Sequence, residues 1–196
     1  MIASETLAAS SSTFALIALA EIGDKSQLVC MTLASRHRHW PVILGAALAF
    51  SLLNVLAVVF GAAAAAWLPQ PVAATIVAIL FFAFAVHAFL QKDDDDDGDV
   101  VEKPGYGIFV TTLLLIFVAE FGDKTQIAVA GLAGSLAPLS VWIGATAALV
   151  TVSALGVWAG RTVLQRLPLF WLHRLGAALF LLFAILAGAR ALGLNP

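Results

Sequence analysis

Hydrophobic residues occur in long runs along this chain, and short polar stretches separate the runs. The apolar runs cover about residues 12–33, 40–67, 72–90, 106–132, 140–160 and 175–191. A helix that crosses a bilayer needs about 20 mostly apolar residues. The pattern therefore predicts an all-α integral membrane protein with six transmembrane helices.

The longest polar stretch lies near the middle of the chain. Residues 92–104 contain a run of five consecutive aspartates, Asp93 to Asp97, together with further charges. A block of like charges of this kind is typical of a solvated linker. We therefore expect a three-helix repeat at 1–91, an acidic cytoplasmic linker at 92–104, and a second three-helix repeat at 105–196.

Two of the predicted spans contain a polar stretch that is costly inside a membrane. Residues 21–27 read EIGDKSQ, and residues 120–126 read EFGDKTQ. An offset of 99 residues without a gap relates the two stretches, and it also relates Gly45 to Gly144 and Gly61 to Gly160. Each half has an odd number of spans, so the two repeats must insert in opposite orientations. This inverted arrangement is common in secondary transporters, whose sites lie near the midplane between the repeats.

Composition supports the membrane assignment. The chain is 62% hydrophobic and 11% charged, with a mean hydropathy of +1.01, whereas soluble domains contain about 25% charged residues. A net charge of −2 does not indicate a nucleic-acid partner. The single cysteine, Cys30, excludes an intrachain disulfide. The start of the chain lacks the basic region of a cleaved signal peptide, so we expect it to lead into the first span.

Basic residues lie in alternate connections. Arg36, Arg38, Lys92, Lys103, Arg161, Arg166 and Arg174 all fall on one predicted side, and Arg190 falls on the other. By the positive-inside rule, the basic loops and the acidic linker are cytoplasmic and both termini are outside. The predicted location is a bacterial inner (cell) membrane. The five tryptophans fall near predicted span ends, as interfacial anchors do.

The repeated stretch brings several polar groups together. On a continuous helix, residues three or four apart share a face, so Glu21 would lie beside Asp24 and could pair with Lys25. Gly23, like its counterpart Gly122, would allow close helix packing, or a local break that exposes carbonyls. A two-fold axis in the membrane plane would bring Glu21, Asp24, Glu120 and Asp123 together. We expect these carboxylates and the amides of Gln27 and Gln126 to be cation ligands, supported by Lys25, Lys124, Ser26, Thr125, Asn54 and Ser153.

Such oxygen ligands suit calcium, magnesium or manganese. Four carboxylates and two lysines sum to −2, which one divalent cation or two protons would neutralise. Crowding of like charges also favours proton uptake. Exchange of a divalent cation for protons at one site is the simplest consequence. The cation and the protons would be transported species, and no cofactor is expected.

Other interpretations of the same residues stay open. The charges could form structural pairs, Glu21 with Lys25 and Glu120 with Lys124, although charges within a membrane are usually functional. The polar pair Asn54 and Ser153 could equally serve interhelical hydrogen bonding. Alternatives for the whole protein are a passive divalent-cation channel, a Ca²⁺/H⁺ exchanger, an intramembrane enzyme and a non-transporting scaffold. No HExxH pattern occurs, so an enzyme is not expected.

The doubled Glu-x-Gly-Asp-Lys-Ser/Thr motif, in the first and fourth of six predicted spans, resembles the GDT-type cation/proton exchanger family. That family includes transmembrane protein 165 and the bacterial MneA-type manganese exporters. The resemblance covers about residues 14–192 and implies exchange of manganese, calcium or both for protons. It also implies that Glu21, Asp24, Glu120 and Asp123 are the essential carboxylates, and that a bacterial member exports manganese. Manganese is preferred over calcium on the resemblance alone.

Overall fold

The computed structural model describes residues 2–90, 107–164 and 169–194, and all regular structure in these ranges is helical. The helices are α1 (Ile2–Glu21), α2 (Lys25–Arg36), α3 (His39–Trp67), α4 (Gln70–Leu90), α5 (Ile108–Glu120), α6 (Lys124–Ala133), α7 (Pro138–Leu164) and α8 (Leu169–Ala191). The acidic linker predicted at 92–104 and the loop arginine Arg166 lie outside the described residues. The prediction of an all-helical membrane protein is confirmed.

Four helices are long and apolar enough to cross a bilayer by themselves, namely α3, α4, α7 and α8. The pair α1 and α2 meets the same criterion together but bends by 72° at the break between the two helices. The first span was predicted over about 12–33 with a break at Gly23 left open, and the structure shows that the chain turns at Ile22–Asp24. Helix α5 has 13 residues and is shorter than a full span, so the six-span count stays a prediction.

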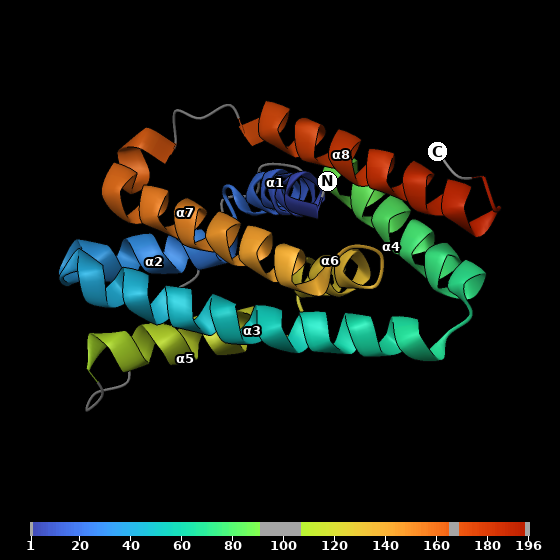
Figure 1. Ribbon diagram of the computed structural model, residues 1–196. Helices are drawn as coiled ribbons and strands as arrows, with labels where there is room; N and C mark the ends of the chain where they lie inside the picture. The colour runs from blue at the N-terminus through green and yellow to red at the C-terminus, as the bar shows by residue number, and fades with distance from the viewer. Residues whose placement is uncertain (1, 91–106, 165–168, 195–196) are drawn as a thin grey trace.

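The two halves pack across each other (Figure 1). Helix α1 packs mainly against α7 of the other half, and α5 packs in the corresponding way against α3. Glycines allow both contacts: a Cβ at Gly45 would lie 2.5 Å from the Phe109 carbonyl oxygen, and one at Gly144 would lie 2.4 Å from the Ser10 carbonyl oxygen. The two contacts are equivalent, because the same offset of 99 residues that relates the motifs also relates Gly45 to Gly144. The broken helices are therefore held by the unbroken helices of the opposite half.

Helices α4 and α8 form a separate aromatic pair beside this crossed core (Figure 1). The ring of Phe81 in α4 stacks 5.9 Å from that of Phe180 and lies 5.8 Å from that of Phe183, both in α8. The pair rests against α1 and α6. It covers the bundle on the flank where these two helices lie.

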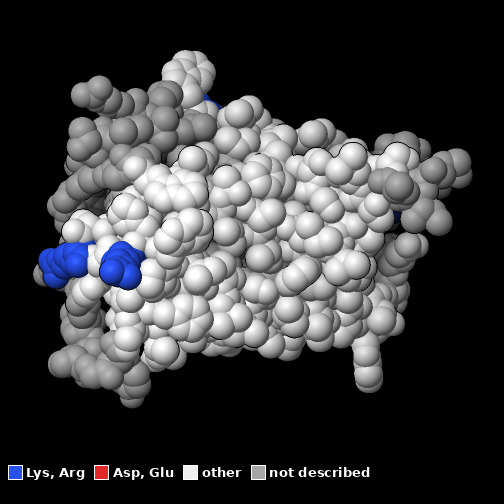
Figure 2. All heavy atoms as spheres, turned by 60° about the vertical axis from the view of Figure 1, so that its left-hand side comes forward, with Lys and Arg blue, Asp and Glu red and all other residues white. Residues whose placement is uncertain are grey.

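The outer surface is that of a lipid-embedded protein. In Figure 2 the broad middle of the face in view has no charged side chain among the described residues, and the lysines and arginines in view lie toward its edges. Large apolar side chains such as Phe60, Val118 and Ile185 are mostly exposed. Exposed apolar area on this scale is typical of a membrane surface.

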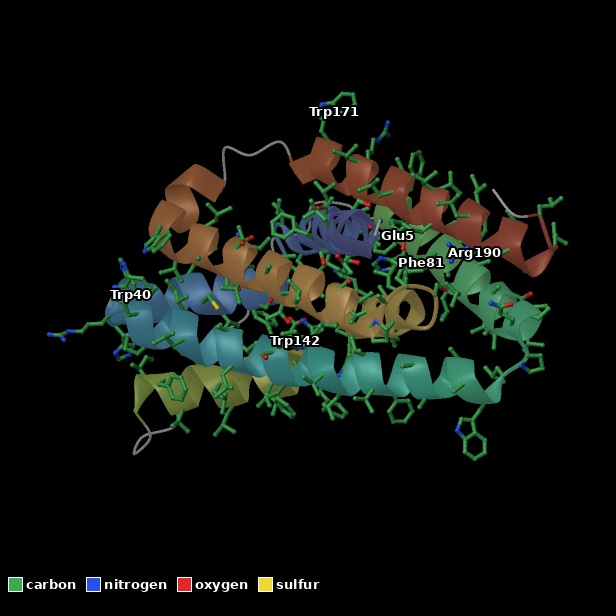
Figure 3. The ribbon with its side chains drawn as sticks, viewed as in Figure 1. Glu5, Trp40, Phe81, Trp142, Trp171 and Arg190 are labelled. Carbon is green, nitrogen blue, oxygen red and sulfur yellow. The ribbon has the colours of Figure 1, made fainter. Side chains whose placement is uncertain are left out.

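The tryptophans divide into two groups. Trp40 and Trp171 are about two-thirds exposed. Trp171 points away from the bundle (Figure 3), and the Trp40 ring lies edge-on to that of Trp158 in α7, with 6.2 Å between the ring centres. Trp142 instead lies over the middle of α3, where its indole N–H donates to the Ser51 carbonyl at 3.2 Å. Trp142 therefore joins α7 to α3, and its predicted interfacial position stays a prediction.

Candidate cation site

Each motif is a break between two helices. Helix α1 ends at Glu21 and α2 begins at Lys25, while α5 ends at Glu120 and α6 begins at Lys124. The chain turns at Gly23 and Gly122, whose φ angles are +87° and +80°. Glycine adopts this left-handed conformation without steric cost. The glycines therefore permit a break, which was one of two expectations, and a Cβ at Gly122 would meet no neighbour within 4 Å, so close packing is not its role.

The breaks place the acidic residues at helix ends. Glu21 is the last residue of α1, and Asp24 is the N-cap of α2, where its carboxylate accepts from the Lys25 backbone N–H at 2.7 Å. The two residues do not share a continuous helix face, as their spacing had suggested. The carboxyl end of a helix carries partial negative charge. The end of α1 therefore favours a cation beside Glu21, while the start of α2 carries partial positive charge and favours the Asp24 carboxylate that caps it.

Three of the four predicted carboxylates converge. Oxygen atoms of Glu21, Asp24 and Asp123 all lie within 4.8 Å of one another. Glu21 is 1% exposed and Glu120 is 7% exposed, but Glu120 does not belong to this group of three. The group combines both motifs, so residues about 100 positions apart form one site.

Two further contacts cross between the halves. The Lys124 ammonium forms a salt bridge and a hydrogen bond with the Asp24 carboxylate. The Thr125 hydroxyl donates to the Glu21 carboxylate, and the Ser26 hydroxyl reaches the other Glu21 oxygen at 3.5 Å. A pairing of Lys124 with Glu120 on one helix was one interpretation of the sequence, and the structure instead pairs Lys124 with the opposite motif. Lys25 is exposed.

The glutamines contact backbone groups. The Gln27 amide oxygen accepts from the Gly23 N–H at 2.8 Å, and the Gln126 amide oxygen accepts from the Gly122 N–H at 2.6 Å. Their nitrogens donate to carbonyls of α7 and α3. Both were expected to present the amide oxygen to a cation, whereas in this structure each oxygen is directed at its own break.

The polar residues predicted on the second and fifth spans are buried. Asn54 and Ser153 are each 2% exposed. The Asn54 amide donates to the Thr146 hydroxyl at 3.1 Å, which joins α3 to α7. For Asn54 this is the interhelical hydrogen bonding that was the alternative to a role in binding. Thr146 was missed because its counterpart at the repeat offset is Ala47, so the duplication gave no signal.

A small cavity lies next to Lys124, on the flank covered by α4 and α8. It has a volume of about 20 Å³, and its lining includes Lys124 and His87. A cavity needs roughly 10–15 Å³ to hold one water molecule. The space next to the Lys124 side chain is therefore large enough for a water.

Taken together, broken helices, carboxylates that converge from two repeated motifs and an apolar exterior define an integral membrane protein of the cation-transporter class. The comparison of sequences gives the family: the chain belongs to the GDT1 family, described as divalent cation/proton antiporters, whose sequence profile matches residues 9–96 and 108–193. The protein is therefore a transporter of the cation/proton antiporter type and not an enzyme.

Several curated relatives match most of the chain. A Vibrio cholerae protein named as a manganese exporter is 32% identical over 172 residues, covering 86% of this chain and 84% of the relative. A GDT1-like protein of Synechocystis is 30% identical, with 88% and 92% covered. The Saccharomyces cerevisiae divalent cation/proton antiporter GDT1 is 24% identical, with 87% and 80% covered. No solved structure matches the chain significantly.

Proposed function

We propose that this protein exports Mn²⁺ from the cytoplasm in exchange for protons, by alternating access at the site between the two motifs. The observation that carries the proposal is the convergence of Glu21, Asp24 and Asp123 within 4.8 Å. Carboxylate oxygens in this number suit a hard divalent cation. Mn²⁺ is preferred because of the name of the Vibrio relative, and Ca²⁺ is the alternative substrate.

The proposed architecture is six transmembrane helices in two inverted three-helix repeats. Each broken pair, α1–α2 and α5–α6, would be one span that is interrupted at mid-depth. The crossed packing of α1 on α7 and of α5 on α3 supports this arrangement, because an inverted pair of repeats exchanges equivalent contacts. Glu120, which is buried at the end of α5, would complete the ligand set when the repeats rearrange.

Charge explains why exchange for protons is favoured. Four carboxylates and two lysines give the empty site a charge of −2, which one divalent cation or two protons cancel. Each unit charge moved across 100 mV costs about 2.3 kcal/mol, so export of a divalent cation against an inside-negative potential costs about twice that amount. Entry of two protons would remove this electrical cost.

The test is transport by purified protein in proteoliposomes with an imposed pH gradient. We expect Mn²⁺ flux that follows the gradient, and we expect Glu21→Gln and Glu120→Gln to abolish it. Glu5→Gln is the matched control, because Glu5 is an exposed carboxylate in α1 far from the break along the helix. Mn²⁺ flux that is unaffected by collapse of the pH gradient would replace this proposal with a passive channel. Flux of Ca²⁺ in place of Mn²⁺ would identify a Ca²⁺/H⁺ exchanger.

The proposed location is a bacterial inner membrane, with both termini outside and the basic loops in the cytoplasm. Cysteine labelling from either side tests this orientation, because the native Cys30 is fully buried. A cysteine at Glu5 should react with an impermeant reagent in intact cells, and one at His37 should not. The reverse pattern would invert the orientation and the direction of transport.

A further inference from the structure

The two motif glutamines connect the site to the opposite half of the protein. In the first half, the Gln27 oxygen accepts from the Gly23 N–H at 2.8 Å, and its nitrogen donates to the Val152 carbonyl in α7 at 3.0 Å. We name this set of contacts the first amide bridge. Gln27 is 3% exposed, so both ends of the amide are removed from solvent.

The second half repeats the arrangement. The Gln126 oxygen accepts from the Gly122 N–H at 2.6 Å, and its nitrogen donates to the Leu53 carbonyl in α3 at 3.2 Å. We name this the second amide bridge. Leu53 and Val152 are related by the same offset of 99 residues that relates the glutamines. The chain therefore forms the same three-part contact twice, with different neighbours, which argues against a chance arrangement.

The chemistry of the bridge requires an uncharged amide. The break frees a backbone N–H at the glycine, which needs an acceptor inside the membrane. The second contact needs a donor at the end of the same side chain. Glutamate would supply acceptors alone and lysine would supply donors alone, whereas glutamine has one of each at this length.

We propose that Gln27 and Gln126 are positioning residues, which hold each break in place against the long helix of the opposite half, and that they are not cation ligands. Gln27 is three residues after Asp24 and in the first turn of α2, so the first amide bridge fixes the start of the helix that Asp24 caps. The second amide bridge does the same for Asp123 at the start of α6. This inference shares one assumption with the proposed function, namely that these aspartates belong to the cation site.

The two bridges differ in one neighbour, which provides a selective test. A Cβ at Gly156 would lie 2.7 Å from the Gln27 Cγ. The equivalent position in the other half is Ala57, so the second half has a methyl group at the position that is glycine in the first bridge. Gly156→Ala should therefore displace Gln27 without changing any atom of the cation site. Gly188→Ala is the matched control, because a Cβ at that helical glycine meets nothing within 4 Å.

The experiment is hydrogen exchange of the metal-free, detergent-solubilised protein, followed by mass spectrometry. We expect Gln27→Leu and Gly156→Ala each to increase the exchange rate of peptides covering 22–28 by about tenfold, since local opening becomes easier when the bridge is lost. The second break, covered by 121–127, should be unchanged, and Gln126→Leu should give the converse pattern. The double variant Gln27→Leu/Gly156→Ala should exchange no faster than the more affected single variant, because both remove the same contact.

A ligand role gives a different result. If Gln27 were only a ligand, the metal-free exchange of Gln27→Leu would match that of the wild type while Mn²⁺ affinity fell, and the proposal would be overturned. If Gln27→Leu does not purify as a folded protein, Gly156→Ala decides: wild-type exchange at 22–28 rejects the first bridge, and faster exchange there supports it. Because the measurement uses no metal, absence of Mn²⁺ transport in the wild type would reject the proposed function and leave the bridges intact.

Discussion

The two broken helix pairs have almost the same motif but contribute differently to the site. In the first pair, α1–α2, Glu21 and Asp24 both belong to the carboxylate cluster, and Lys25 is exposed. In the second pair, α5–α6, Asp123 alone joins the cluster, and Lys124 turns toward the opposite motif to bind Asp24. The first pair thus supplies most of the negative charge, and the second supplies a cation and a hydroxyl donor.

This difference shows that two motifs with nearly the same sequence need not have the same contacts within one conformation of the protein. Under the proposed alternating access, a transporter built from inverted repeats opens to one side of the membrane at a time, so its equivalent residues would occupy different environments in an outward-open or an inward-open state. The lysines are where this is clearest, since they occupy equivalent positions in the sequence but Lys25 is exposed and Lys124 is partly buried. The following substitutions compare equivalent residues of the two pairs, beginning with the largest expected effect.

Substitution of the two aspartates should give the largest difference in the free energy of unfolding. Asp24→Asn removes the partner of Lys124, and the two side chains are 17% and 23% exposed. Loss of one partner of a buried pair costs about 3–5 kcal/mol, and partial exposure places this pair near about 3 kcal/mol. Asp123→Asn should cost less than about 1 kcal/mol, because the Asp123 side chain makes no N-cap hydrogen bond to α6, whereas the Asp24 carboxylate caps α2. Chemical denaturation of the solubilised protein measures both values, and equal losses would contradict the asymmetry.

Substitution of the two hydroxyl residues, Thr125 and Ser26, should give the second-largest difference in the free energy of unfolding. Thr125→Val removes a hydrogen bond to the buried carboxylate of Glu21, and bonds to charged groups contribute about 1.5–3 kcal/mol. Ser26→Ala removes a contact of 3.5 Å to the same carboxylate, which is at the limit of hydrogen bonding, and a hydrogen bond to the Glu120 carboxylate. We expect a loss of about 2 kcal/mol for Thr125→Val and about 1 kcal/mol for Ser26→Ala, since Glu120 is less deeply buried than Glu21. A larger effect of Ser26→Ala in the same unfolding assay would reverse the assignment.

The lysines should differ in cation binding. Lys124→Met removes the ammonium that binds Asp24, so a divalent cation no longer has to displace it. A partly exposed pair contributes about 1 kcal/mol, which corresponds to roughly five- to tenfold tighter Mn²⁺ binding. Lys25→Met should change the affinity by less than about twofold, because the Lys25 side chain is exposed and screened. Calorimetric titration at fixed pH checks both variants, and weaker binding by Lys124→Met would show that the ammonium does not compete.

The glycines should not differ. Gly23 and Gly122 have nearly the same positive φ, +87° and +80°, and a residue with a Cβ in this region costs about 1–2 kcal/mol. Gly23→Ala and Gly122→Ala should therefore each lower the free energy of unfolding by about 1 kcal/mol. At Gly122 no steric contribution is added, since a Cβ there has open space. If the losses in free energy of unfolding differ by more than about 1 kcal/mol, the two breaks differ in energy despite their similar φ angles.

The sequence predicted the parts of this molecule that depend on burial and repetition. Apolar runs predicted the helical membrane protein, because lipid-facing surface has a clear compositional signature. The duplicated motif indicated which carboxylates to examine, and three of them meet in the structure. Backbone acceptors such as the Val152 and Leu53 carbonyls were missed, since every residue has a carbonyl and no side chain marks those that receive a bond.

Two other features could not be read from the residues. A broken helix and a continuous helix with a packing glycine have the same apolar flanks, so Gly23 was compatible with both, and the φ angle decides between them. The salt bridge from Lys124 to Asp24 of the opposite motif was equally hidden. Both lysines follow Gly-Asp in the same motif, and an asymmetry between identical motifs arises only from the three-dimensional arrangement.

The crossed packing of the halves also constrains how the protein is made. The contact from Thr125 to Glu21 joins residues 104 positions apart. At a synthesis rate of roughly 5–20 residues per second, the ribosome needs about 5–20 s to produce the second residue after the first. During that interval the break at Gly23 has neither Val152 nor Thr125 to satisfy its polar groups. The first half therefore remains in the membrane as an incomplete intermediate until the second half is synthesised. Insertion factors that shield polar groups would be most needed at its break.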